Sequence, residues 1–198
     1  MKKVKIAVAC SGGGTNLQAV LDSQGTVLAS GEVALVLIDR PGAYALERAK
    51  AANVPAFELN RKSPDFTDKA LELFEQFGIG LIITAGFLTI FAEKITKKYE
   101  NRIINVHPAL IPSFCGMGFY GLHVHRAALD YGVKVTGATV HYANEIVDGG
   151  RIILQKAVGV EDGDTPETLQ KRVMEQGEWV ILPQAAELVC KKILENPK

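Results

Sequence analysis

The sequence predicts an α/β protein with a Rossmann-like, mostly parallel sheet of about seven strands that is flanked by helices. Short β-branched apolar runs alternate along the chain with segments of helical period, which is typical of βαβ units. The strand-like runs are almost continuously hydrophobic, as expected when helices cover both faces of a parallel sheet. The length of 198 residues suits a single domain over residues 1–198.

The parallel part of the sheet is expected in the first half of the chain. Its strands are predicted at five apolar runs, over residues 4–10, 33–39, 56–59, 80–86 and 102–106. Segments with helical spacing follow the first three strands, over residues 15–24, 43–52 and 65–78. The linker 87–100 separates the last two strands and is expected to supply the fourth helix.

The pattern changes after residue 110. Residues 111–121 read as a loop, and a helix follows that ends at Gly132. Two β-rich runs, 136–144 and 150–160, lie too close together for a crossover helix between them. We therefore expect an antiparallel hairpin, which makes the sheet mixed.

Two helical segments complete the chain. The first covers residues 165–176, with Thr165 as the N-cap and Pro166 at the first helical position. The second covers residues 178–194. Both fit helices that pack against the sheet.

Composition excludes several classes of protein. The 22 basic and 22 acidic residues balance, which argues against a nucleic-acid or membrane-surface partner. Cys10, Cys115 and Cys190 are too few and too scattered for a disulfide framework or a zinc knuckle, and they fit a reducing cytoplasm. The apolar run at the start is too short for a signal peptide, and the chain has no apolar stretch of 18 residues. A cytoplasmic protein is expected.

Residues 11–16, SGGGTN, join the first strand to the first helix. Glycines at a helix N-terminus let backbone N–H groups approach an anion, so we expect a phosphate-sized ligand there, with a tight turn without a ligand as the alternative. A dinucleotide is a third possibility. Gly12 and Gly14 match the start of G-x-G-x-x-G and Asp39 ends the second strand, but Leu17 replaces the third glycine.

All four histidines lie within 35 residues of one another, at His107, His123, His125 and His141. A metal site is disfavoured because no cysteine or glutamate lies at a familiar ligand spacing. His123 and His125 would also point apart on a helix. General acid–base chemistry is the preferred interpretation, and no metal is expected.

Residues 104–114, INVHPALIPSF, place two polar side chains where an apolar strand ends. Asn105 and His107 would project from the same side of the strand, at the edge where parallel sheets bind ligands. An amide and a protonatable imidazole can stabilise a developing oxyanion. Asp148, beside two glycines, is the leading candidate for a carboxylate that keeps the imidazole protonated. A structural histidine remains the alternative for His107 alone.

The motifs NVHPALIPSF, GLHVHRAAL, VTGATVHYANEIVDGGRIILQ and SGGGTNLQ together resemble the folate-dependent formyltransferase family over essentially the whole chain. The glycine turn and the chain length are similar to those of one branch of this family. That branch formylates glycinamide ribonucleotide (GAR, 5′-phosphoribosylglycinamide) in de novo purine (IMP) biosynthesis. The resemblance implies a formyltransferase fold, with a phosphate-binding half at 1–100 and a catalytic and folate-loop half at 101–198. It implies 10-formyltetrahydrofolate as co-substrate, small molecules as partners, and a monomer or homodimer.

The resemblance also implies the role of each site residue. Asn105 and protonated His107 would hold the oxyanion, His107 would be the general acid, and Asp148 would raise its pKa and move a proton through a water. The GAR contacts would be Gly12, Gly13, Gly14, Thr15, Asn16, Leu17 and Glu178, with Glu175 as the alternative to Glu178. The folate contacts would be Lys62 (or Arg61), Phe87, Leu88, Thr89, Ile90, Phe91, Asn105, Asn144, Glu145 and Asp148.

Thr139 and His141 would support the site from behind. Around residues 172–183, the chain holds one residue more than some relatives.

Two other functions are weighed. A formyltetrahydrofolate hydrolase or a formyltransferase for initiator tRNA usually needs a further domain, for which 198 residues leave no room. An NAD-binding Rossmann protein would leave Asn105, His107 and Asp148 unexplained.

Overall fold

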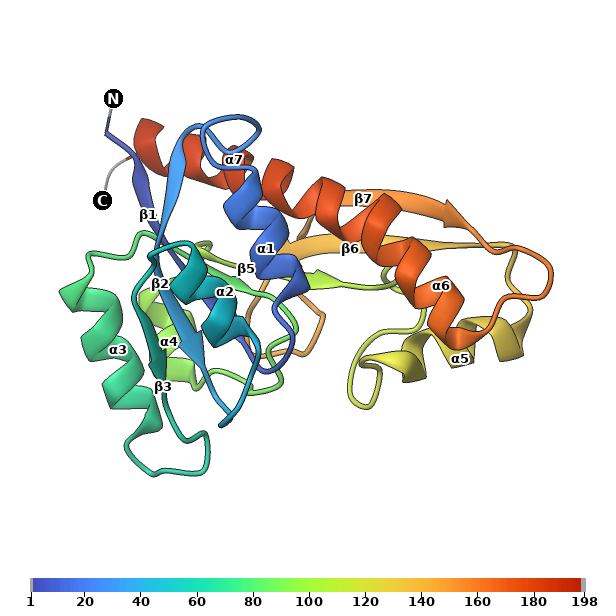
Figure 1. The fold of residues 1–198 in the computed structure, drawn as a ribbon, viewed down its shortest axis with the longest axis horizontal. Helices are drawn as coiled ribbons and strands as arrows, with labels where there is room; N and C mark the ends of the chain where they lie inside the picture. Colours follow the sequence, from blue (N-terminus) through green and yellow to red (C-terminus); the bar gives the residue numbers. More distant parts are fainter. Residues whose placement is uncertain (1, 197–198) are drawn as a thin grey trace.

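The computed structural model describes residues 2–196 and contains one seven-stranded sheet between layers of helices (Figure 1). The strand order is β3-β2-β1-β4-β5-β6-β7. Strands β1 to β5 are parallel, and β6 and β7 form the antiparallel hairpin. The strands are β1 (Val4–Cys10), β2 (Gly31–Ile38), β3 (Ala56–Glu58), β4 (Leu81–Thr84), β5 (Ile103–His107), β6 (Val135–Tyr142) and β7 (Ile152–Gly159). The predicted fold class is confirmed.

The helices alternate with the parallel strands and then follow the hairpin. They are α1 (Thr15–Asp22), α2 (Ala45–Ala51), α3 (Phe66–Gln76), α4 (Glu93–Lys98), α5 (Leu122–Tyr131), α6 (Pro166–Val173), the π-helical turn η1 (Met174–Glu178) and α7 (Trp179–Glu195). The predicted cap of α6 is confirmed, since the Thr165 hydroxyl accepts a hydrogen bond from the Thr168 amide. Between residues 2 and 196 we find no helix long and apolar enough to cross a membrane.

The central strands of the sheet are buried on both faces. Ile6 and Val8 of β1 belong to a core that includes residues of α1, α2 and α7, whereas the alternate residues Ala7 and Ala9 belong to a core with α3 and α4. Side chains alternate between the faces of a strand, so a strand with two covered faces needs apolar residues throughout. This explains why β1 reads as an unbroken hydrophobic run.

The linker between β4 and β5 contains less helix than expected. Only Glu93–Lys98 is helical, and the residues from 87 to 92 form an irregular segment. The backbone there bonds to the end of β1 instead, because the Ser11 amide donates to the Gly86 carbonyl and the Leu88 amide donates to the Ser11 hydroxyl. This segment is therefore held at the carboxyl edge of the sheet.

The segment for which the resemblance implies one extra residue contains η1. A π-helical turn accommodates one additional residue without breaking the flanking helices, and such turns occur frequently at functional sites. Gly177 lies in this turn against the sheet, where an added Cβ would come within 3.1 Å of the Ala138 Cβ. The turn thereby presents Glu178 next to the carboxyl edge of the sheet.

Candidate active site

Three segments meet at the carboxyl edge of the parallel strands: the glycine turn after β1, the irregular segment after β4, and the end of β5. Ligands of open α/β sheets bind at this edge. A large cavity of about 730 Å³ and a smaller one of about 130 Å³ lie there. Asn105 and Asp148 line both cavities, and therefore lie where the two meet.

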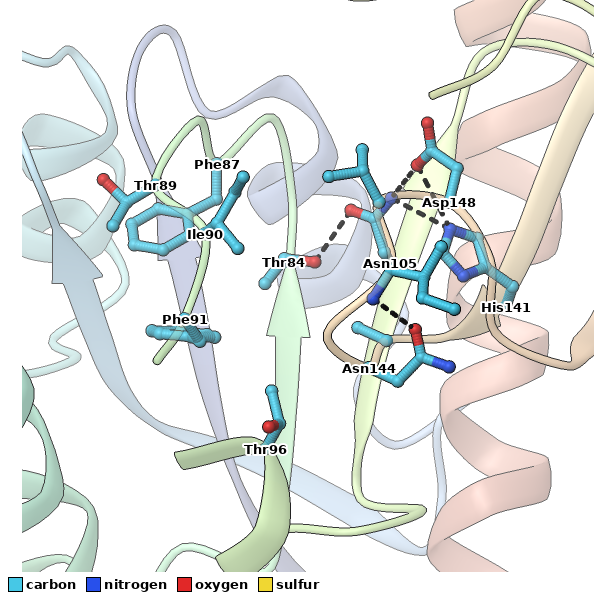
Figure 2. Close-up of a pocket in the computed structure, with 13 residues that line it drawn as sticks. Thr84, Phe87, Thr89, Ile90, Phe91, Thr96, Asn105, His141, Asn144 and Asp148 are labelled. Atoms are coloured by element: carbon cyan, nitrogen blue, oxygen red, sulfur yellow. Dashed lines mark hydrogen bonds and ion pairs between the residues drawn. The ribbon is translucent and has the colours of Figure 1, made fainter. Parts of the chain in front are cut away.

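Neighbouring side chains fix the orientation of Asn105 (Figure 2). The Thr84 hydroxyl donates to its Oδ1 at 2.7 Å. Its Nδ2 lies 3.1 Å from His141 Nε2 and 3.4 Å from Asp148 Oδ1. Because Thr84 occupies the carbonyl oxygen, the amide presents its N–H groups to the loop that carries Asp148.

The buried ring of His107 lies between two acceptors. Its Nε2 donates to the Phe114 carbonyl at 2.8 Å, and its Nδ1 lies 3.5 Å from Asp148 Oδ2. Two acceptors favour the doubly protonated ring. Burial nevertheless lowers the pKa of His107 below its ordinary value, and the opposing effects of Asp148 and Phe114 do not restore it. Asp148 therefore raises the pKa of His107 as expected, but burial outweighs this effect.

Asp148 has a left-handed backbone conformation, with φ at 55°. Non-glycine residues seldom adopt it, and such positions cluster at functional sites. The carboxylate accepts a hydrogen bond from the Gly116 amide at 2.9 Å, and the side chain is 8% exposed. Burial raises the pKa of Asp148, but His141, His107 and the Gly116 amide together lower it below its usual range. Asp148 is thus held ionised beside the imidazole.

His141 and Thr139 lie on β6 behind this group, as expected. His141 Nδ1 donates to the Tyr142 carbonyl at 2.9 Å, and its Nε2 lies 3.1 Å from Asn105 Nδ2 and 3.5 Å from Asp148 Oδ1. The Thr139 hydroxyl accepts from the Ile111 amide and donates to the Ala109 carbonyl. His141 therefore orients Asn105, and Thr139 holds the chain that follows His107.

The two glycines after Asp148 are required by close backbone contacts. A Cβ on Gly150 would lie 1.7 Å from the Tyr142 carbonyl oxygen, and one on Gly149 would lie 2.5 Å from the Ile146 side chain. Neither contact is sterically possible. The glycines therefore let the loop turn back toward β6 and bring Asp148 to Asn105.

We expect Gly150→Ala to lower the free energy of unfolding by about 1–3 kcal/mol, because the new methyl group must displace backbone. Urea denaturation measures this change. Gly159→Ala is the matched control, since a Cβ on Gly159 meets nothing within 4 Å. Equal stability of the two variants would contradict the proposed contact.

The glycine turn has the geometry of an anion site. Gly14 is the N-cap of α1 with φ at 70°, and it provides no side-chain cap. The first helical bond runs from the Gln18 amide to the Gly14 carbonyl, which leaves the three preceding amides of α1 available to a ligand. Gly12 and Gly13 are exposed, whereas the Leu17 side chain is fully buried and only its backbone can take part.

Glu178, not Glu175, faces the large cavity. The Asn16 side-chain amide donates to Glu178 Oε2 at 2.7 Å, and Thr15 and Asn16 line the cavity with Glu178. Burial raises the pKa of Glu178 to about 7, although the Asn16 bond lowers it. Glu175 is exposed and pairs with Lys171 on its own helix.

Glu178→Gln is expected to stabilise the unliganded protein at pH 8 by up to about 3 kcal/mol. The unfolded carboxyl ionises near its ordinary value of 4.5, whereas the native one keeps its proton to about 7. Wild-type stability therefore falls as pH rises from 4.5 to 7, and the variant lacks this loss. Urea unfolding at pH 5 and pH 8 tests this, with Glu175→Gln as control. A stability difference that is independent of pH would contradict the assignment.

The smaller cavity lies between two segments (Figure 2). One wall is the segment after β4, and the other is the loop that carries Asp148. Of the predicted folate residues, Phe91 and Asn144 line only the smaller cavity, Leu88 lines only the large one, and Phe87, Thr89 and Ile90 line both.

Two predicted folate residues do not line either of these cavities. Glu145 is exposed, and its carboxylate accepts from the Thr96 hydroxyl at 2.7 Å. Lys62 is exposed, and the neighbouring Arg61 lines the large cavity in its place.

Sequence reasoning missed several residues of the large cavity, among them Arg40, Gln170 and Met174. Gln170 and Met174 precede Glu178 by eight and four residues. Helical spacing puts i, i+4 and i+8 on one face, so this signal was available in the sequence. Arg40 follows the second strand and carried no comparable signal.

Asp39, the acid expected for a dinucleotide ribose, is buried, and one of its two carboxylate oxygens is bonded within the protein. It is 2% exposed, and its Oδ2 accepts from the Thr89 hydroxyl at 2.6 Å. Together with Leu17 in place of the third glycine, this geometry disfavours NAD. Over the described range 2–196, the acidic, cysteine and histidine side chains form no group of three that could hold a metal ion.

A parallel sheet with an anion turn, and an amide, an imidazole and a carboxylate together at its carboxyl edge, are typical of α/β enzymes that act on small molecules. The chain belongs to the formyl transferase family, whose model matches residues 4–185.

Relatives with known names agree with this family. The chain is 35% identical over 183 residues to the phosphoribosylglycinamide formyltransferase of Haemophilus influenzae, covering 90% of this chain and 84% of that protein. The solved structure of glycinamide ribonucleotide transformylase 1 from Symbiobacterium toebii has a TM-score of 0.87 and 41% identity, covering 96% of this chain and 89% of that one. The trifunctional purine biosynthetic protein adenosine-3 of Gallus gallus is 40% identical over 192 residues, but the chain spans only 18% of its length.

Proposed function

We propose that this protein transfers the formyl group of 10-formyltetrahydrofolate to the amine of 5′-phosphoribosylglycinamide, giving formyl-GAR for de novo purine biosynthesis in the cytoplasm. The observation that carries the proposal is the position of Asn105 and Asp148 where two cavities meet, with His107 beside Asp148 on the wall of the larger one. The larger cavity contains Thr15 and Asn16 of the anion turn. A phosphorylated acceptor would enter it, and the formyl donor would occupy the smaller one.

The ribonucleotide would place its phosphate on the amides at the start of α1, where the glycines leave room. Glu178, held by Asn16, would bind a polar group of the same substrate. The pterin of the folate would lie against the apolar wall that contains Phe87 and Phe91, whose ring centroids are 5.1 Å apart. The two substrates would then meet at Asn105.

The chemistry would begin with attack of the amine on the formyl carbon. The Asn105 amide would exchange its 3.4 Å contact with Asp148 for the developing oxyanion, since so long a hydrogen bond is weak. Protonated His107 would stabilise the same charge and act as general acid. Asp148 would favour the imidazolium and help move the amine proton, through a water, toward the departing folate nitrogen.

Ligand-induced stabilisation tests this proposal against the two alternatives. A ligand at 100 times its dissociation constant adds about 2.7 kcal/mol to the free energy of unfolding. We expect GAR, and separately a folate, to raise the melting temperature, and NAD to leave it unchanged. A response to NAD alone would refute the proposal. A response to folate but not to GAR would favour a hydrolase.

A further inference from the structure

His125 has a role that the candidate trio does not explain. It lies on α5 with its side chain completely buried, and it lines the large cavity. Neither Nδ1 nor Nε2 has a hydrogen-bond partner among residues 2–196. Its neighbour His123, two residues earlier, is exposed and packs edge-on against Tyr120.

A buried imidazole with two unpartnered nitrogens is unusual. More than nine in ten buried polar groups have a hydrogen-bond partner, and leaving one without a partner destabilises the fold. The fold could have buried an aliphatic or aromatic side chain at this position without that cost. The partner of His125 is therefore expected to come from outside the chain, through the cavity that the ring lines.

The chemistry of the ring restricts what that partner is. Burial and the proximity of His107 lower the pKa of His125 to about 4, so the ring is neutral near pH 7. A neutral imidazole offers one donor and one acceptor. Phosphate oxygens and ionised carboxylate oxygens only accept hydrogen bonds. They can therefore pair with the donor nitrogen of the ring but not with its acceptor nitrogen. A hydroxyl or a carboxamide both donates and accepts, and can complement either nitrogen.

The location favours the ribonucleotide, although Arg61 and Leu88 of the predicted folate contacts also line the large cavity. His125 lines the large cavity, which also contains Thr15, Asn16 and Glu178, and it does not line the smaller one. We propose that His125 binds the ribonucleotide substrate directly, through a hydroxyl or carboxamide group that pairs with the neutral imidazole. This inference rests on the proposed function and adds a specificity-determining contact to it.

The test compares His125→Phe, which keeps an aromatic ring of similar volume, with His125→Gln, which keeps a donor and an acceptor. We expect the Phe variant to raise the KM for GAR roughly 10- to 100-fold, because the bound hydroxyl or amide loses its partner. The KM for 10-formyltetrahydrofolate should change less than about twofold. The Gln variant should recover part of the lost affinity for GAR. The melting temperature of the Phe variant should be no lower than that of wild type.

Direct titration of GAR into folate-free protein gives the second measurement, with His123→Phe as the matched control. A weaker affinity in His125→Phe alone supports the inference. An unchanged GAR affinity and KM in that variant would overturn it, and would mean that the ring binds only water. Should His125→Phe not fold, His125→Leu is judged by the same criteria. A wild-type protein that does not bind GAR would refute the proposed function itself.

Discussion

His107→Ala is expected to lower kcat for formyl transfer by a factor of 10² to 10⁴, the usual contribution of a general acid. The ring is 4% exposed and lies between the Phe114 carbonyl and Asp148, so it is well placed to deliver a proton and a positive charge to the reacting centre. Alanine supplies neither. The phosphate of GAR would bind at the glycine turn, so the affinity that this contact gives should persist. Steady-state kinetics and calorimetric titration measure the two quantities separately.

His123→Ala is the control, because this exposed histidine lies outside the trio. It should keep nearly wild-type kcat. If His107→Ala keeps more than about a tenth of wild-type kcat, the loss is smaller than the usual contribution of acid–base catalysis. The assigned role is then ruled out. A parallel loss of folding, measured by denaturation, would mean that the histidine is mainly structural.

Asp148→Asn is expected to lower kcat and to move the pH–rate profile toward acid. Burial lowers the pKa of His107, and the Asp148 charge raises it. Without that charge the pKa falls further, so the imidazolium is lost at a lower pH. The rate carried by the protonated ring then declines earlier as pH rises, and the loss relative to wild type is greatest at alkaline pH. Asparagine tolerates the left-handed backbone at this position, so the substitution isolates the charge.

The profile of kcat from pH 5 to pH 9 measures this shift. Asp162→Asn is the control, since this carboxylate is fully exposed and lines neither cavity. Its profile should coincide with that of wild type. If Asp148→Asn lowers kcat at every pH but does not displace the profile along the pH axis, the carboxylate does not tune the pKa of the imidazole.

The sheet could be predicted from sequence because its signal is local. The central strands of the parallel half are short apolar runs, and both of their faces are buried. The linker 87–100 was less predictable. Its backbone is captured by Ser11 at the end of a strand almost 80 residues earlier in the chain, and no local pattern reveals such a contact.

The trio could also be anticipated, because polar residues at a strand end and an Asp-Gly-Gly turn are conspicuous in an apolar context. The direction in which the pKa of His107 is shifted could not be anticipated. It depends on how completely the ring is buried, and burial here outweighs the nearby carboxylate. The roles of Arg40 and His125 could likewise not be predicted from the sequence. Both residues line a cavity whose walls come from distant segments of the chain.

The most direct test follows the formyl carbon. Protein is incubated with 10-formyltetrahydrofolate labelled in the formyl group, with and without GAR, and the labelled products are separated. We predict one formyl-GAR formed for each folate consumed, with negligible consumption when GAR is absent. Release of labelled formate at the same rate with or without GAR would contradict the account, because water would then be the acceptor.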